Sequence, residues 1–95
     1  MRLDLFLKSS RLVIRRTLAQ SYCDAGAIVV NGVPAKSSRT VKVGDEIRVP
    51  RSGGALTVRV RAIPSTKQVS KEAAADLYEV IGVAHEDFGN DGILR

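Results

Sequence analysis

The sequence predicts an α+β domain in which two N-terminal helices pack on a small antiparallel sheet and a short C-terminal helix follows. Three observations carry this prediction: helical apolar spacing before residue 26, an Asn-Gly hairpin signal soon after it, and period-two alternation between residues 56 and 62. The length of 95 residues and the apolar fraction of 44% suit one modest core. We therefore predict one domain over residues 1–81 and an acidic, weakly ordered tail over residues 82–95.

The two N-terminal helices are separated by Ser9-Ser10, which interrupts the apolar pattern. The first helix is predicted over about residues 2–8, where apolar side chains recur at helical spacing. These side chains are Leu3, Phe6 and Leu7. The second helix is predicted over about residues 14–25, with one apolar stripe and a C-terminal cap at Gly26. The stripe comprises Ile14, Leu18, Tyr22 and Ala25.

The character of the sequence changes after Gly26 from helical spacing to strand signals. Asn31-Gly32 best tolerates the positive φ angles of a type I′ turn, so residues 28–30 and 33–35 should pair as antiparallel strands. Residues 41–43 and 46–49 are predicted to be the next two strands, joined by a turn at Gly44-Asp45.

Two further elements are predicted toward the C-terminus. Leu56, Val58 and Val60 alternate with polar residues, which is typical of a half-buried strand. Residues 71–80 are predicted to be the third helix, with Ser70 as its N-cap.

The charge distribution divides the chain into a basic part and an acidic part. The formal net charge is +5, but residues 1–71 contain fourteen basic and four acidic side chains, whereas residues 72–95 contain one basic and six acidic side chains. A basic region favours polyanionic partners, and an acidic tail is repelled by phosphate. We therefore expect the partner surface on the first part of the chain.

Cations gather around the predicted turn between the first two helices. They are Arg2, Lys8, Arg11, Arg15 and Arg16, accompanied only by Asp4. Guanidinium groups bind phosphate through paired donors, so these residues predict a salt-sensitive RNA-binding patch. Asp4 could pair with Lys8 one turn later, or it could orient Arg11 or Arg16. Lys36 and Arg39 follow the hairpin in a loop, where they could extend the patch or merely solubilise a turn.

Catalytic and metal-binding constellations are sparse. Cys23 cannot form an internal disulfide and is expected to be a buried apolar residue, and His85 is the single histidine. We therefore expect no enzyme activity, no metal and no cofactor. With no membrane-spanning segment or signal peptide in the sequence, we expect a cytoplasmic protein. We also expect it to be a monomer. Low aromatic content favours recognition of folded RNA through its shape and backbone over stacking of single strands.

Several motifs in residues 1–49 resemble the RNA-binding domain named after ribosomal protein S4. They are Arg2-Leu3-Asp4 with Phe6-Leu7, then Arg11, Arg15-Arg16 and Ala19, then residues 26–32, Lys36 and residues 43–47. The resemblance implies the alpha-L RNA-binding motif. It matches Arg2 and Arg16 to the family's RNA-contacting basic positions, with Lys8, Arg11 and Arg15 as supports. Asp4 matches an acidic position that fixes the arginine geometry.

The remainder of the chain resembles two groups within this family. The Arg-bearing strand and residues 70–79 are similar to bacterial ribosome-quality-control P-site factors and to heat-shock protein fifteen. The short acidic tail favours the first group, because the heat-shock relative has a long basic extension. The resemblance then implies binding to large-subunit rRNA and peptidyl-tRNA on obstructed subunits, and a tailing factor that adds alanine as a partner.

Three alternatives remain open at this point. The chain could recycle large subunits that carry peptidyl-tRNA, as the heat-shock relative does. It could be the RNA-targeting module of an RNA-modifying enzyme, although no catalytic domain accompanies it. It could also dock a protein through the alternating strand or the acidic third helix.

Overall fold

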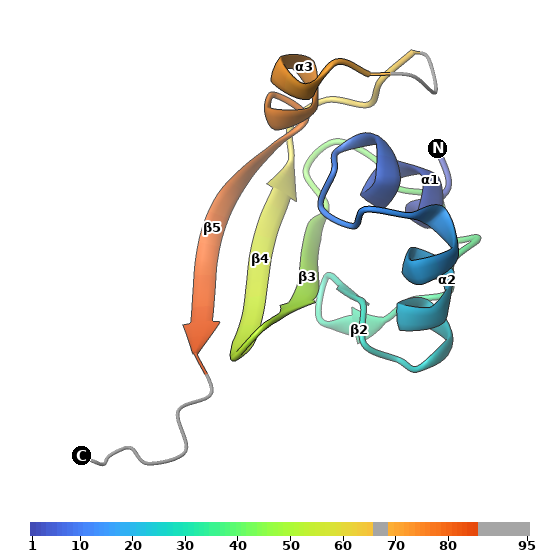
Figure 1. Ribbon diagram of the computed structural model, residues 1–95, viewed down its shortest axis with the longest axis vertical. Coiled ribbons are helices and arrows are strands. Elements are labelled where there is room, and N and C mark those ends of the chain that lie inside the picture. The colour runs from blue at the N-terminus through green and yellow to red at the C-terminus, as the bar shows by residue number, and fades with distance from the viewer. Residues whose placement is uncertain (66–68, 86–95) are drawn as a thin grey trace.

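The chain folds into two helices against a five-stranded antiparallel sheet, with a third short helix between the last two strands (Figure 1). The structure is a computed structural model that describes residues 1–65 and 69–85. Its elements are α1 Leu3–Ser9, α2 Arg16–Asp24, β1 Val29–Val30, β2 Val33–Pro34, β3 Glu46–Arg51, β4 Gly54–Val60, α3 Lys71–Ala75 and β5 Tyr78–His85. The strand order is β2-β1-β3-β4-β5, so the predicted α+β class is confirmed.

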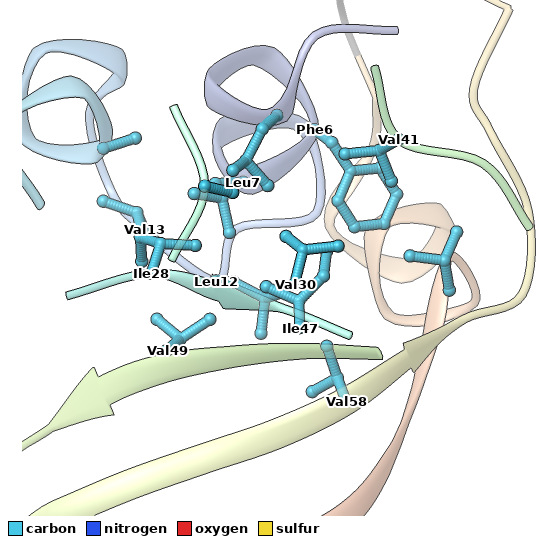
Figure 2. Packing of buried hydrophobic residues seen from close by; sticks show 14 of the residues in the cluster. Phe6, Leu7, Leu12, Val13, Ile28, Val30, Val41, Ile47, Val49 and Val58 are labelled. Carbon is cyan, nitrogen blue, oxygen red and sulfur yellow. The ribbon is translucent and has the colours of Figure 1, made fainter. Parts of the chain in front are cut away.

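The hydrophobic core lies between the two N-terminal helices and the middle of the sheet. Leu3, Phe6 and Leu7 of α1 are fully buried, as their helical spacing predicted. They join apolar side chains from the strands, among them Val30, Ile47, Val49 and Val58 (Figure 2). The core thus fixes α1 and α2 on the sheet, while β5 runs along the far edge (Figure 1).

The predicted apolar stripe of the second helix was wrong. Helix α2 begins at Arg16, so Ile14 lies in the preceding loop, where it is 83% exposed. The loop instead sends Leu12 and Val13 into the core, and Ala19 and Cys23 form the buried face of α2. Ala19 and Cys23 were predicted to lie beside the stripe, so the buried face is rotated from the predicted one toward these two smaller residues.

The Asn31-Gly32 hairpin forms as predicted. Both residues have positive φ angles, 52° and 85°, and they join β1 to β2. The prediction of a strand over residues 41–43 was wrong. Val41 is buried in an irregular segment, and its amide donates to the carbonyl of Met1 at 2.8 Å instead of entering the sheet.

Asp45 explains the irregular segment that precedes β3. Its buried carboxylate accepts hydrogen bonds from the amide of Lys42 and from the side chain of Asn31, both at 3.1 Å. Strand β3 then begins at Glu46 and continues through Pro50, which pairs with Ala55 across the hairpin. The Asp45 carboxylate thus satisfies the Lys42 amide, which a neighbouring strand would otherwise satisfy.

The C-terminal elements differ from the prediction of a helix over residues 71–80. The Ser70 hydroxyl caps α3 by accepting from the amide of Ala73 at 3.1 Å, but α3 ends at Ala75. Residues 78–85 form β5, which pairs along β4 and satisfies that strand's backbone groups. The pairing shifts register between Thr57 and Val58, so Ile81 is an extra residue that hides the period of two.

The same finding corrects the expected start of the weakly ordered tail. Residues 82–85 belong to β5 and pair with β4, contrary to the expectation of an aperiodic segment from Gly82. Residues 86–95 lie outside the described part of the chain. The division into a domain and a tail stays a prediction.

Candidate nucleic-acid interface

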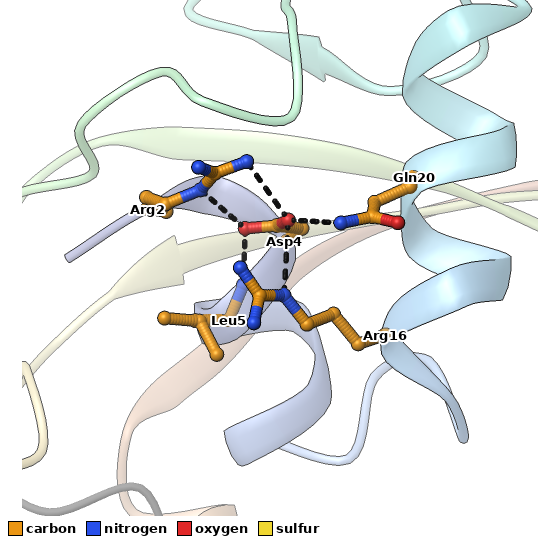
Figure 3. A network of polar contacts seen from close by, with 5 residues as sticks. All are labelled: Arg2, Asp4, Leu5, Arg16 and Gln20. Carbon is orange, nitrogen blue, oxygen red and sulfur yellow. Dashed lines mark hydrogen bonds and ion pairs between the residues drawn. The ribbon is translucent and has the colours of Figure 1, made fainter.

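The buried carboxylate of Asp4 joins the two N-terminal helices. Its side chain has no exposed surface, although a charged residue between the apolar positions of an amphipathic helix is expected on the outside. The Arg2 guanidinium donates to both carboxylate oxygens, at 3.2 and 3.3 Å, and Nε of Arg16 donates to Oδ2 at 3.2 Å. Gln20 also donates to Oδ2 at 2.9 Å, and the Leu5 amide donates to Oδ1 at 2.8 Å (Figure 3).

We name these four side chains the Asp4 cluster: Arg2, Asp4, Arg16 and Gln20. Of the three partners weighed for Asp4, the structure supports Arg16. Among the described residues, the side-chain donors to Asp4 are Arg2, Arg16 and Gln20, and neither Lys8 nor Arg11 is one of them. Gln20 was missed by the sequence analysis. Its position one helical turn after Arg16 is the signal that could have identified it, because residues four apart lie on the same side of a helix.

The Asp4 carboxyl is ionised in the folded chain. Burial by itself raises the pKa of this group, but hydrogen bonds from Gln20, Arg2, Arg16 and the Leu5 amide outweigh burial and hold the pKa below its usual value. The carboxylate therefore fixes both guanidinium groups at neutral pH. Two cations surround one anion, so the cluster keeps an excess positive charge.

Both arginines remain accessible despite their ion pairs with Asp4. The Arg2 side chain is 46% exposed and the Arg16 side chain is 39% exposed. A guanidinium carries five N–H donors, and Arg2 uses two of its donors on Asp4 while Arg16 uses one. The remaining donors are available at the surface in a fixed orientation. This geometry suits paired recognition of phosphate oxygens.

The loop that contains Lys36 and Arg39 lies against the N-terminus of α1. The amide of Leu3 donates to the Arg39 carbonyl at 2.8 Å, and the amide of Asp4 donates to the Ser37 carbonyl at 3.2 Å. These bonds satisfy two amides that the first turn of a helix leaves without partners. Arg2 also forms an isolated bridge with Thr40. The exposed Lys36 and Arg39 are thereby placed beside Arg2 and not in a distant turn.

The other predicted cations are positioned differently. Lys8 is exposed on α1, one turn after Asp4. Arg11 adopts a positive φ of 61°, and its guanidinium donates to the Val69 carbonyl at 3.2 Å, toward the segment before α3. Arg15 is the N-cap residue of α2 and is exposed. The structure therefore gathers Arg2, Arg16, Lys36 and Arg39, whereas Arg11 lies apart from them.

The described residues include few groups suited to catalysis or metal binding. Burial, followed by the charges of Asp4 and Asp24, raises the pKa of the Cys23 thiol to about 11, which disfavours the thiolate needed of a nucleophile. Within residues 1–65 and 69–85, no three His, Cys, Asp or Glu side chains are grouped to hold a metal ion. None of the helices in those ranges is both long and apolar enough to cross a membrane.

Comparison with known proteins assigns the family. Residues 1–47 match the S4 domain. The RQC P-site tRNA stabilizing factor of Halalkalibacterium halodurans is 49% identical over 80 residues, which cover 84% of this chain and 89% of the relative. The chain belongs to the RQC P-site tRNA stabilizing factor family. The RQC P-site tRNA stabilizing factor of Bacillus subtilis is also similar, at 47% identity over 81 residues that cover 85% of this chain and 92% of the relative.

Two solved structures share the fold of this chain. A trimeric structure of heat shock protein 15 from Vibrio cholerae superimposes with a TM-score of 0.78 at 27% identity, covering 85% of this chain and 81% of that one. The solution structure of HP1423 gives a TM-score of 0.74 at 36% identity, covering 86% and 98%. The resemblance drawn from the N-terminal motifs is confirmed.

Proposed function

We propose that this chain binds RNA of the large ribosomal subunit and peptidyl-tRNA when the subunit is obstructed, and that it holds the tRNA in the P site. The Asp4 cluster is the observation that carries the proposal. It presents two half-exposed guanidinium groups whose orientation is fixed by a buried carboxylate. Lys36, Arg39 and Lys8 add cations around the cluster. Such groups bind a phosphate backbone without bond chemistry.

The relatives support the choice of partner. Proteins 49% and 47% identical to this chain are named for stabilising P-site tRNA in RQC, and they align over most of both lengths. On this proposal, a tailing factor adds alanine to the stalled chain while the tRNA is held. The protein would then act in the cytoplasm, on the ribosome and as a monomer.

A second candidate function is favoured by the likeness to heat shock protein 15. That likeness has a TM-score of 0.78, but the sequence identity is 27%, well below the 49% of the P-site factor. The two functions differ in outcome, because a recycling factor would clear peptidyl-tRNA from the subunit and a tailing cofactor would retain it. We favour retention of peptidyl-tRNA, because the P-site factors have the higher sequence identity to this chain.

Sedimentation through sucrose tests the proposal directly. Purified large subunits with and without peptidyl-tRNA are incubated with the full chain, and bound protein is measured in the pellet. We expect retention on the obstructed subunit, and loss of at least tenfold in binding for Arg16→Glu, because a carboxylate placed beside Asp4 repels phosphate.

Arg48→Glu is the matched control, since Arg48 is an exposed arginine of β3 that lies outside the Asp4 cluster. It makes the same change in net charge. If both variants lose binding equally, the interaction depends on net charge and not on the Asp4 cluster. If both variants bind the subunit as the wild type does, the proposed interface is contradicted. The presence of peptidyl-tRNA in the pellet after incubation separates holding from recycling.

A further inference from the structure

An open apolar pocket lies on the other side of α2 from the Asp4 cluster. Its volume is about 350 Å³, within the range of roughly 300–1000 Å³ typical of small-ligand sites. It is lined by residues 12–14 of the loop before α2, by Leu18 and Tyr22 of α2, and by residues 50–52 at the end of β3. The sequence analysis placed Tyr22 on the apolar stripe of the second helix, but the side chain is only partly buried and lines this opening.

Helix geometry separates the pocket from the guanidinium groups at Asp4. Successive residues of an α-helix are rotated by about 100°, so Leu18 lies roughly 200° around the axis from Arg16. Ala19 and Cys23 are buried against the core and form the face between the two sides. A ligand in the pocket therefore makes a contact of its own and does not share the donors of Arg2 and Arg16.

The loop that forms one wall of the pocket is held in place. Leu12 and Val13 are buried, the Val13 amide donates to the Leu7 carbonyl at 3.1 Å, and the Leu12 carbonyl accepts from Arg51 at 2.7 Å. Ile14 follows directly and is 83% exposed. A single exposed isoleucine is ordinary on a protein surface. Here a rigid loop presents it at the rim of an apolar opening, where a ligand would bury it.

The charges around the pocket identify the class of ligand. Arg51 lines the pocket, no acidic residue does, and Arg15 directly follows the pocket-lining Ile14 in the chain. Arg51 is oriented by its bonds to the carbonyls of Leu12 and Pro50, at 2.7 and 3.1 Å. A ligand that fits must therefore combine a flat or apolar group with negative charge close by. A nucleotide has this combination, since its base is a planar ring next to a phosphate.

We infer that this pocket receives an unstacked base of RNA, with the adjoining phosphates beside Arg15 and Arg51. The inference rests on the proposed RNA-binding function and adds a base contact to it. The Asp4 cluster then supplies phosphate contacts on one side of α2, and the pocket takes a base on the other side. The chain thereby distinguishes RNA with unpaired nucleotides from a fully paired duplex.

The test uses two fluorescein-labelled RNAs with the same number of phosphates, a hairpin with an unpaired loop and a blunt duplex. We expect tighter binding of the hairpin by the wild-type chain. Ile14→Ser should weaken hairpin binding by roughly tenfold, the loss expected for one base contact, and leave the duplex unaffected. The slope of log affinity against log salt should not change, because no phosphate contact is removed.

Val33→Ser is the control, since Val33 is likewise an exposed β-branched residue, 58% exposed in β2, and it does not line the pocket. A hairpin with 2-aminopurine in its loop adds a direct readout. Its emission should change on binding to wild type and to Val33→Ser, and remain that of the free RNA with Ile14→Ser. Thermal melts of the variants confirm that both are folded.

Arg16→Gln separates failure of the inference from failure of the proposed function. If Arg16→Gln lowers the salt slope while Ile14→Ser binds both RNAs as wild type does, the base site is overturned and the proposed RNA-binding function stands. If neither the wild type nor any variant binds either RNA, the proposed function fails as well. Hairpin-specific loss in Ile14→Ser with an unchanged slope supports the base site.

Discussion

The described part of the chain contains two arginine–carboxylate clusters that are built in inverse ways. In the Asp4 cluster, one buried carboxylate lies between two half-exposed guanidinium groups. On the sheet, Arg59 of β4 lies between Glu46 of β3 and Glu79 of β5, and donates to each at 3.2 Å. We name this second group the Arg59 cluster. The first has an excess of positive charge and the second an excess of negative charge.

The inverse arrangement gives each cluster a different capacity for binding. The carboxylates hold the Arg59 guanidinium, and the bonds to Glu46 and Glu79 raise its pKa, but the two anions repel an approaching phosphate. The Asp4 carboxylate is buried beneath its arginines, so a phosphate meets guanidinium donors first. An arginine in an ion pair can therefore belong to an RNA surface or merely to a cross-strand ladder. The decisive difference is which partner is buried.

Removing arginines from each cluster tests this difference with the largest expected effect. We predict that the double variant Arg2→Gln/Arg16→Gln loses at least tenfold in RNA affinity per arginine, as expected for charge-assisted hydrogen bonds. The log–log salt slope should fall by roughly 0.7 to 0.9 for each phosphate contact removed. Fluorescence anisotropy with an RNA hairpin over a series of KCl concentrations measures both quantities.

Arg59→Gln is the control for the double variant, because it removes a guanidinium of similar exposure from the opposite kind of cluster. Its affinity and salt slope should stay close to those of the wild type. A loss equal to that of a single arginine of the Asp4 cluster would break the comparison. RNA binding would then follow total charge and not the burial of the carboxylate.

Much of the fold followed from local signals in the sequence. The Asn31-Gly32 turn, the burial of Leu3, Phe6 and Leu7, and the Ser70 cap all depend on a few adjacent residues, and each is observed. The strand β5 could not be predicted in this way. Its alternation is interrupted by the extra residue Ile81, and its stability comes from pairing with a strand distant in sequence.

The candidate site was predictable in its residue types but not in its geometry. The clustering of Arg2 and Arg16 near Asp4 followed from the sequence and its family resemblance. The burial of Asp4 did not, because a charged residue in an amphipathic helix is normally placed on the exposed face. Only the packing of α2 on α1 creates the enclosed position in which Arg2, Arg16 and Gln20 compensate the charge.

Neutralising one carboxylate in each cluster should have a smaller effect, on stability. Asp4→Asn keeps the side-chain volume but leaves two half-exposed guanidinium groups without a charged acceptor, so we predict a loss of about 2 kcal/mol in the free energy of unfolding. The value is below that of a fully buried ion pair, because both arginines keep solvent contact. Glu79→Gln should cause no measurable change, since its ion pair is exposed. Urea denaturation at pH 7 measures both variants.

The stabilisation by the Asp4 carboxylate should depend on pH in a defined direction. The pKa of Asp4 is lower in the folded chain than its ordinary value of 3.8, so the stabilisation is fully present above that value. It is lost as the pH falls through the still lower pKa of the folded state, where the carboxylate becomes protonated. The difference in stability between wild type and Asp4→Asn should therefore be constant near neutral pH and narrow below 3.8. A difference that grows on acidification would contradict the proposed role of the carboxylate.

The reactivity of Cys23 measures how firmly α2 alone is docked, because Cys23 lies on the buried face of the helix that carries Arg16. With a pKa of about 11, roughly a thousandth of the thiol is ionised at pH 8, and burial hinders access further. Alkylation by iodoacetamide should be at least about 100-fold slower in the folded chain than in urea. The residual rate reports how often α2 opens.

Asp4→Asn should raise that residual rate, since Asp4 joins α1 to α2 through Arg16 and Gln20. Glu79→Gln should leave it unchanged, because the hydrogen bonds of the Arg59 cluster link β4 to β3 and β5. If both variants raised the rate equally, opening of α2 would require unfolding of the whole domain, and the two clusters would stabilise one cooperative unit. A rate raised only by Asp4→Asn means that the buried carboxylate controls the docking of the helix that presents Arg16, and with it the position of the guanidinium offered to RNA.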